Sequence, residues 1–203
     1  KAVYNFAVSE WGLEIQSPFT ELYLDRDSGV NKRVPIAIDD IRRIQQSCYK
    51  LDDDLRWAVA MISDTGARLA EIIGASVHDL DLDSDKAPTL HIRPHKWRSL
   101  KTLSSNRTVP LVGAALWGAR RAASSTQDAF LFPRYNKADL TNTNSASAAL
   151  SKWIKAEGRT DYTMHSFRHS FRDRLRAVEC PHDVTDQLGG WSRQSVGESY
   201  GQG

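Results

Sequence analysis

The sequence predicts a mainly α-helical chain with a small antiparallel β-hairpin, which is an α+β fold. Apolar residues recur at helical spacing in most segments, as Leu55, Val59 and Ile62 do. Two short segments, 89–93 and 107–111, are predicted strands instead, joined by a long polar loop. With 203 residues, 40% of them hydrophobic, the chain can bury a substantial core in one main domain.

The first part of the chain predicts a helix over residues 1–12, which Ser17, Pro18 and Phe19 end. A polar stretch follows from Asp25 to Arg33 and has the composition of a linker. We therefore expect a short helical segment that is set apart from the rest of the chain.

The remainder predicts a series of helices and turns. A short helix is expected to begin at Arg68 after Gly66 breaks the preceding one. Apolar periodicity predicts the longer helices from about residue 38, over about 53–64, 111–124, 144–157 and 164–178, and in a short segment ending at Leu188. Gly189 and Gly190 then predict a turn.

Four aspartates alternate with apolar residues over 79–85 and resemble the start of a calcium loop. Its sixth position is Ser84 instead of glycine and its twelfth is Leu90 instead of glutamate, so we reject a calcium site and predict a half-exposed strand. The three histidines nearby show no metal-ligand spacing and are predicted to be exposed loop residues: His78, His91 and His95.

The charge distribution is more informative than the net charge, which is +2 from 27 basic and 25 acidic residues. No carboxylate lies between Asp85 and Asp128, where there are eight basic residues: Lys86, Arg93, Lys96, Arg98, Lys101, Arg107, Arg120 and Arg121. Four arginines form a second group within 168–176. Such groups are expected on a nucleic-acid-binding surface, although a solvated face has the same composition.

The helix predicted over 164–178 has two distinct faces. His165, Arg168 and Arg172 share one face, and an apolar stripe lies beside it: Phe167, Phe171, Leu175 and Val178. An imidazole and a guanidinium one turn apart, with Tyr200 downstream, have the chemistry to hold a phosphodiester for attack by a phenol.

Further motifs match a known pattern. Thr65–Glu71 reads TGARLAE, Leu100-Lys101-Thr102 precedes Arg107-Thr-Val-Pro-Leu111, and Trp191 lies nine residues before Tyr200. Together with His165-x-x-Arg168, these resemble the tyrosine recombinase (phage integrase) family over about residues 35–200. The resemblance implies the catalytic core that this family shares with type IB topoisomerases.

The resemblance also implies a catalytic set, namely Arg68, Lys101, His165, Arg168, Trp191 and Tyr200. In it the two arginines bind the phosphate, Lys101 protonates the departing 5′ oxygen and Tyr200 attacks phosphorus. His165 acts as general base or orienting donor. Trp191 stands where most members have histidine, and its N–H can donate a hydrogen bond but cannot shuttle a proton.

Other residues are expected to support this set or to bind DNA. Glu71 is expected to hold Arg68 one helical turn away, although an exposed surface pair has the same spacing. The predicted DNA contacts are Lys96, Arg98, Arg107, Arg172 and Arg174. The resemblance implies no metal and no cofactor.

The resemblance divides the chain into a remnant of an upstream core-binding domain (1–19), a linker (20–34) and a catalytic domain (35–203). The competing interpretation is that residues 1–19 are simply the first helix of one domain. The implied partner is double-stranded DNA at a specific site, with a homotetramer on synaptic DNA for the full-length protein. The oligomeric state of this chain by itself stays open, with a monomer among the options.

The predicted function is site-specific recombination through a 3′-phosphotyrosine, without metal or ATP. A type IB topoisomerase, a non-catalytic DNA-binding relative and a plain helical structural domain are the alternatives. No apolar run is long enough to span a bilayer, and we expect a cytoplasmic, nucleoid-associated protein of bacterial or phage origin.

Overall fold

The computed structural model describes residues 2–12, 15, 18, 34–82, 87–137 and 139–191. The chain forms two compact units, Lys1–Lys32 and Arg33–Gly203. The first unit contains helix α1 (Ala2–Trp11), in which Val3, Phe6 and Trp11 are exposed. Most of the predicted linker lies outside the described residues, so the assignment of residues 1–19 to an upstream domain stays a prediction.

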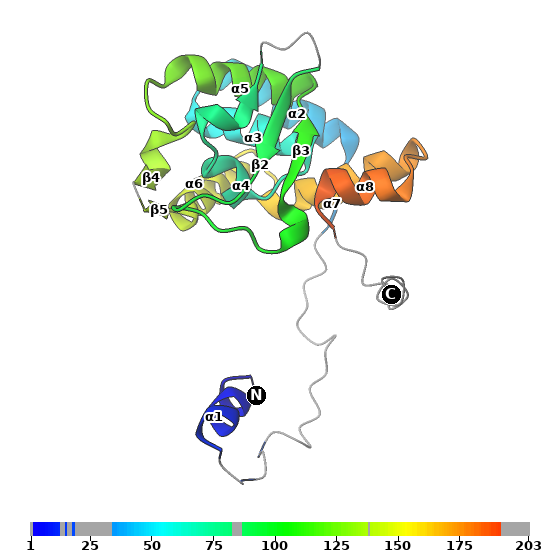
Figure 1. The fold of residues 1–203 in the computed structure, drawn as a ribbon. Coiled ribbons are helices and arrows are strands. Elements are labelled where there is room, and N and C mark those ends of the chain that lie inside the picture. The colour runs from blue at the N-terminus through cyan, green and yellow to red at the C-terminus, as the bar shows by residue number, and fades with distance from the viewer. Residues whose placement is uncertain are drawn as a thin grey trace, which may run out of the picture. The chain divides into compact units, whose positions relative to one another are not determined.

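The second unit is mainly helical, as the sequence predicts (Figure 1). Its helices are α2 (Ile38–Leu51), α3 (Asp54–Thr65), α4 (Leu69–Ile73), α5 (Gly113–Ser125), α6 (Thr143–Ala156), α7 (Met164–Ala177) and α8 (His182–Gly189). Three single 3₁₀ turns join them: η1 (Val77–Asp79), η2 (Leu103–Ser105) and η3 (Pro133–Tyr135). The predicted helices are therefore confirmed, with ends that differ by a few residues.

A three-stranded antiparallel sheet lies beside the helices. Its strands are β1 (Leu80–Asp81), β2 (Thr89–Ile92) and β3 (Arg107–Pro110), in that order. Leu90 pairs with Val109, and both side chains are buried. Strand side chains alternate between two faces, so Arg107 shares the buried face of Val109. A two-stranded hairpin pairs β4 (Asn136–Lys137) with β5 (Leu140–Thr141).

The strand predicted over 79–85 is shorter than expected. Only Leu80 and Asp81 form strand β1, and residues 83–86 lie outside the described part of the chain. Asp79 ends the preceding turn and is fully buried, where its carboxylate accepts hydrogen bonds from Ser76 N and Arg93 Nε. The prediction of a half-exposed strand is therefore wrong for Asp79. The residue can be buried because these donors offset the cost of burying its charge.

Helix α3 is the centre of the core and packs against α2, α5 and α7 (Figure 1). Its residues 57–63 are all buried. Asp53 caps its start by accepting a hydrogen bond from Arg56 N (3.1 Å). Gly66 ends it with a left-handed φ of +62°, and a Cβ there would lie 2.4 Å from Phe171 Cδ1. This close approach brings α7 to the end of α3.

The apolar stripe predicted on α7 is buried only in part. Phe167 is fully buried and Phe171 and Leu175 are half-buried, but Val178 is 73% exposed. The prediction is wrong at Val178 because the helix ends at Ala177 and the next residue leaves the helical register.

We expect Gly118→Ala to destabilise the second unit by up to about 2 kcal/mol. The new Cβ would lie 2.6 Å from the Trp57 carbonyl oxygen, so overpacking of the α3–α5 contact, at ~1–3 kcal/mol, outweighs the helix propensity of alanine, at ~1 kcal/mol. Urea unfolding measures the change, and Ser125→Ala at an exposed position of α5 is the control. A stabilised Gly118→Ala variant would contradict this packing.

Candidate catalytic site

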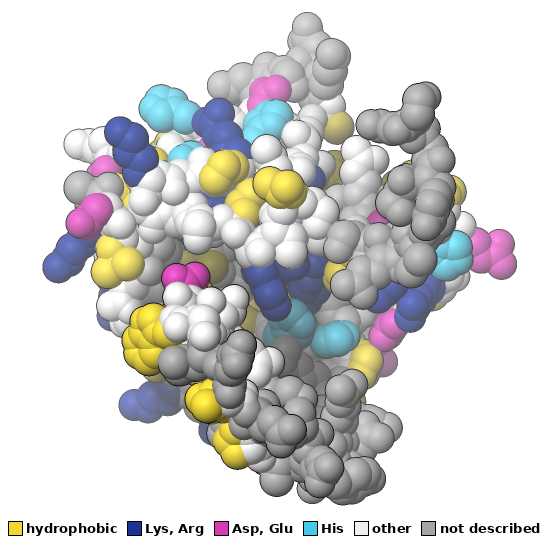
Figure 2. Space-filling model, turned by 60° about the horizontal axis from the view of Figure 1, so that its bottom comes forward, with side chains coloured by type: hydrophobic (Ala, Val, Ile, Leu, Met, Phe, Trp, Pro, Cys, Tyr) yellow, Lys and Arg dark blue, Asp and Glu magenta, His cyan; other side chains and the backbone are white. Residues whose placement is uncertain are grey.

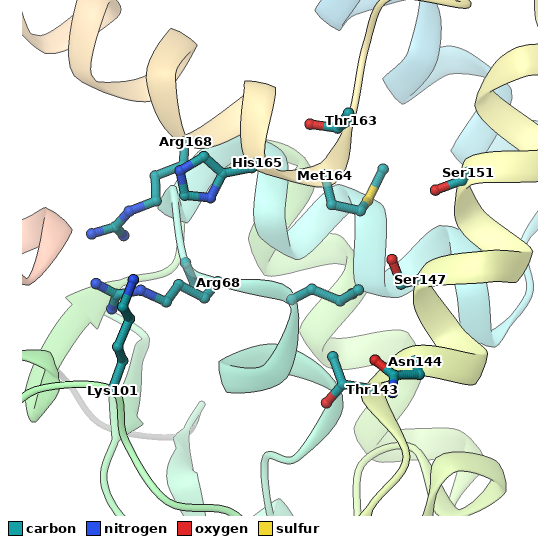
Figure 3. Close-up of a pocket in the computed structure, with 12 residues that line it drawn as sticks. Arg68, Lys101, Thr143, Asn144, Ser147, Ser151, Thr163, Met164, His165 and Arg168 are labelled. Atoms are coloured by element: carbon teal, nitrogen blue, oxygen red, sulfur yellow. The ribbon is translucent and has the colours of Figure 1, made fainter. Parts of the chain in front are cut away.

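A cavity of about 480 Å³ brings together residues from distant parts of the chain. Arg68, Lys101, His165 and Arg168 line one end, and their side chains converge there (Figure 3). The polar face of α6 lines the other end with Thr143, Asn144, Ser147 and Ser151. Figure 2 shows basic and histidine side chains gathered in a hollow on this side of the molecule. Positive charge is therefore concentrated at one end of the cavity.

Arg68 is the residue before α4 and is held by that helix. Its Nη1 donates to Glu71 Oε1 (2.6 Å) and to Ser105 Oγ (2.9 Å), while Glu71 Oε2 accepts from the Arg68 backbone N–H (2.9 Å). All the side-chain hydrogen bonds described for Arg68 use Nη1. Nε and Nη2 have no hydrogen bond described to other residues of the described chain. Glu71 contacts Arg68 as expected, and the role of this contact in holding Arg68 for a phosphate stays a prediction.

Glu71 also binds a second, fully enclosed arginine. Arg107 Nη2 donates to Glu71 Oε2 (2.9 Å), and the two side chains are only 2% and 3% exposed. Burial raises the pKa of Glu71, but hydrogen bonds from Arg107 and Arg68 outweigh it and hold the pKa below the ordinary value. Glu71 therefore remains an anion between two cations.

Arg168 is buried and is oriented by backbone carbonyls. Its Nη1 donates to Gly66 O (2.8 Å), and its Nη2 donates to Gly189 O. Burial first, and then the nearby charge of Arg68, lower the pKa of Arg168 to about 9, which still leaves it cationic at neutral pH. The carbonyls fix a guanidinium at the cavity without neutralising its charge.

Trp191, the last described residue, packs on the site arginines. Its ring centroid lies 4.5 Å from Arg168 Cζ and 5.1 Å from Arg172 Cζ. A Cβ at Gly189 would overlap this ring, so glycine is required there. Trp191 thus supports Arg168, and the hydrogen bond from its N–H to phosphate stays a prediction. Tyr200 lies outside the described residues.

Lys101 is exposed and stands in the long connection between β2 and β3. Ser105 in the same connection is fully buried and contacts Arg68, while its carbonyl oxygen accepts from Arg107 Nη1 (2.9 Å). The sequence reasoning assigned no role to Ser105 and placed Arg107 on DNA. Alternation along β3 signals that Arg107 faces inward with Val109, but nothing in the sequence singles out Ser105.

The cations predicted to bind DNA occupy different environments. Lys96 is exposed. Arg98 is buried and donates to Arg93 O (2.9 Å), and Arg107 is buried as described above. Arg172 packs on Trp191. Arg174 donates to Asp64 Oδ1 (2.9 Å) and to Ser63 O. The contacts of these residues with DNA stay predictions, and Arg98 and Arg107 have little exposed surface for a direct one.

His95 differs from expectation. His95 is half-buried, with Nε2 2.7 Å from Asp79 Oδ2 and its ring stacked on Trp97 at 4.4 Å, so the prediction of an exposed loop residue is wrong. The buried Asp79 carboxylate draws the ring inward. His169, which the sequence reasoning did not select, packs edge-on against His165 at 5.0 Å, one turn along α7.

Within the described residues, no cluster of three or more histidine, cysteine or carboxylate side chains has the geometry of a metal site. No described helix combines the length and the apolar character needed to cross a membrane.

The sequence profile of the phage integrase family matches residues 36–202. The chain belongs to this family. The match covers nearly the whole second unit, including the cavity residues. No curated protein matches the chain.

Solved structures with the same fold are integrases and recombinases. The Tn1549 transposon integrase in complex with transposon right-end DNA is 17% identical with a TM-score of 0.68, over 94% of this chain and 68% of that one. XerA recombinase is 15% identical with a TM-score of 0.59, over 93% and 64%. XerH recombinase bound to its palindromic difH substrate is 18% identical with a TM-score of 0.60, over 89% and 54%. The tyrosine recombinase fold is therefore confirmed.

We expect Glu71→Gln to destabilise the phage integrase domain by roughly 3–5 kcal/mol, because it leaves buried Arg107 without its counter-charge. The folded-state pKa of Glu71 lies below its ordinary value, so its carboxylate contributes stability that is complete well above the unfolded-state pKa and is lost as pH falls through the folded-state pKa. Urea unfolding from pH 7 to pH 3 should show a smaller acid loss in Glu71→Gln.

Exposed Glu157→Gln is the matched control, expected within about 0.5 kcal/mol of wild type. Equal stabilities for the two variants at pH 7 would contradict a buried anionic Glu71.

Proposed function

We propose that the chain is the catalytic domain of a site-specific DNA recombinase that cleaves and rejoins strands through a 3′-phosphotyrosine. The observation that carries this proposal is the convergence of Arg68, Lys101, His165 and Arg168 on one cavity (Figure 3). Membership of the phage integrase family supports it, as do similar integrases and recombinases whose structures contain DNA. The substrate is double-stranded DNA.

Two cations bind the scissile phosphate in this proposal. Arg68 presents Nε and Nη2, and Arg168 faces the same cavity with its orientation set by two carbonyls. Phosphoryl transfer places extra negative charge on the non-bridging oxygens, so fixed guanidinium groups stabilise the transition state more than the ground state. The support of both arginines by buried partners removes the cost of reorienting them during the reaction.

The covalent step exchanges one phosphodiester for another. Tyr200 Oη bonds to phosphorus as the bond to the 5′ oxygen breaks, and Lys101 donates a proton to that oxygen. His165 accepts the phenol proton or orients the phosphate. A 5′ hydroxyl of a second strand then attacks the phosphotyrosine and reverses the step, so the ester bond is conserved and ATP is not needed.

We propose that residues 35–203 catalyse the reaction and that the full-length protein acts as a homotetramer on synaptic DNA. A DNA substrate in a bacterial or phage system places the protein with the nucleoid in the cytoplasm.

Tyr200→Phe should abolish covalent attachment to DNA and leave DNA affinity nearly unchanged, because only the nucleophilic oxygen is removed. The substrate is a nicked duplex carrying the junction sequence recovered from recombination by the full-length protein. A denaturing gel measures the covalent complex and a gel shift measures binding.

Tyr49→Phe is the matched control and should retain wild-type cleavage, because the Tyr49 side chain is exposed on α2. A covalent complex that persists in Tyr200→Phe would assign the nucleophile to another residue.

The proton donor can be identified by replacing the bridging 5′ oxygen with sulfur, a leaving group that departs without a proton. Lys101→Ala should cleave the oxygen substrate about 10²–10⁴-fold more slowly and the sulfur substrate at nearly the wild-type rate. Lys96→Ala, also exposed in this connection, should affect both substrates alike. Sulfur rescue of Lys96→Ala without rescue of Lys101→Ala would transfer the role to Lys96.

A further inference from the structure

The connection that carries Lys101 is attached to the arginines of the site by a buried serine. Ser105 has no exposed surface, and its Oγ accepts a hydrogen bond from Arg68 Nη1 (2.9 Å). The same Oγ lies 2.9 Å from Thr102 Oγ1. Thr102 follows Lys101 directly, so a single hydroxyl joins the phosphate-binding arginine to the residue beside the lysine.

The backbone of this serine is held as well. Arg107 Nη1 donates to Ser105 O (2.9 Å), while Arg107 Nη2 donates to Glu71, the partner of Arg68. The side chain and the carbonyl of Ser105 therefore both depend on the charge network that positions Arg68. Fourteen residues, 93–106, connect β2 to β3, and a connection of this length needs such an anchor to hold one position.

The turn that follows α8 holds the connection from the other side. Gly190 has a left-handed φ of +61°, and a Cβ there would lie 2.8 Å from Arg107 Nη1 and 3.0 Å from Ser104 O. Arg107 Nε also donates to Leu188 O (2.8 Å), the second-last residue of α8. Ser104 and Ser105 are thus enclosed between the charge network and this turn.

We propose that Ser105 is a positioning residue for strand cleavage, whose hydroxyl places Lys101 relative to the phosphate bound by Arg68. This inference rests on the proposed recombinase function. A serine hydroxyl has one donor and two acceptor sites, so it can accept from the guanidinium and exchange a hydrogen bond with Thr102 at the same time. Alanine can do neither, but Arg68 keeps its bonds to Glu71 in that variant.

The distinction between oxygen and sulfur leaving groups tests this role. Only the oxygen substrate depends on the position of Lys101, and a displacement of about 1 Å at a catalytic group can cost ~10²-fold in rate. We expect Ser105→Ala to cleave the oxygen substrate roughly 10- to 100-fold more slowly and the sulfur substrate within about twofold of wild type, with DNA affinity unchanged.

Ser99→Ala is the matched control, because Ser99 is an exposed serine in the same connection between β2 and β3. It should cleave both substrates at the wild-type rate. Equal losses on both substrates for Ser105→Ala would overturn the proposal, because a structural defect or a defect in Arg68 does not depend on the leaving group. No loss on either substrate would overturn it as well.

Thr102→Val provides a second test that does not disturb a buried position, because Thr102 is exposed. It removes the link to Ser105 at nearly constant volume and should show the same loss restricted to the oxygen substrate. If Thr102→Val behaves like wild type on both substrates, the link does not position Lys101. Failure of the proposed recombinase function has a different readout, because the wild-type protein would then form no covalent complex with either substrate.

Discussion

The buried ion pair between Arg107 and Glu71 is the interaction on which the rest of the site depends. Isolated charges in a protein interior are costly, and these two are tolerated because each satisfies several partners. Arg107 donates to Leu188 O on α8, to Ser105 O before β3 and to Glu71 on α4. One side chain on β3 therefore sets the spacing of three elements, and the carboxylate that neutralises it also orients Arg68.

Some arginines of this domain face the cavity, and others are enclosed and hold neighbouring groups in place. Arg68 and Arg168 line the cavity, and each is fixed by acceptors from elsewhere in the chain. Arg107 is enclosed, and Arg174 is bound to Asp64 and the end of α3. The number of basic residues in the sequence is therefore larger than the number available to DNA, because some of these side chains hold the fold together instead.

Local pattern predicted much of the fold because most of its helices are amphipathic and have glycine or aspartate at their ends. Gly66 ends α3, and the alternation of β3 separates Arg107 and Val109 from Thr108. Prediction failed where a distant partner or the end of a helix decides the environment. Buried Asp79 draws His95 inward, and Val178 is exposed because α7 ends before it. Hydrophobic periodicity predicts neither the distance to such a partner nor the residue at which a helix ends.

The sequence by itself determined the fold class, the family and the order of the residues expected to carry the chemistry, because short motifs and hydrophobic periods are properties of neighbouring residues. Only the tertiary structure decided that Arg68, Lys101, His165 and Arg168 share one cavity, that Arg98 and Arg107 are enclosed, and that Ser105 links the lysine to Arg68. Burial and hydrogen-bond partnership arise when segments more than 100 residues apart pack together, as Gly66 and Arg168 do at 102 residues' separation. A linear pattern contains the residue types but not the distances between them.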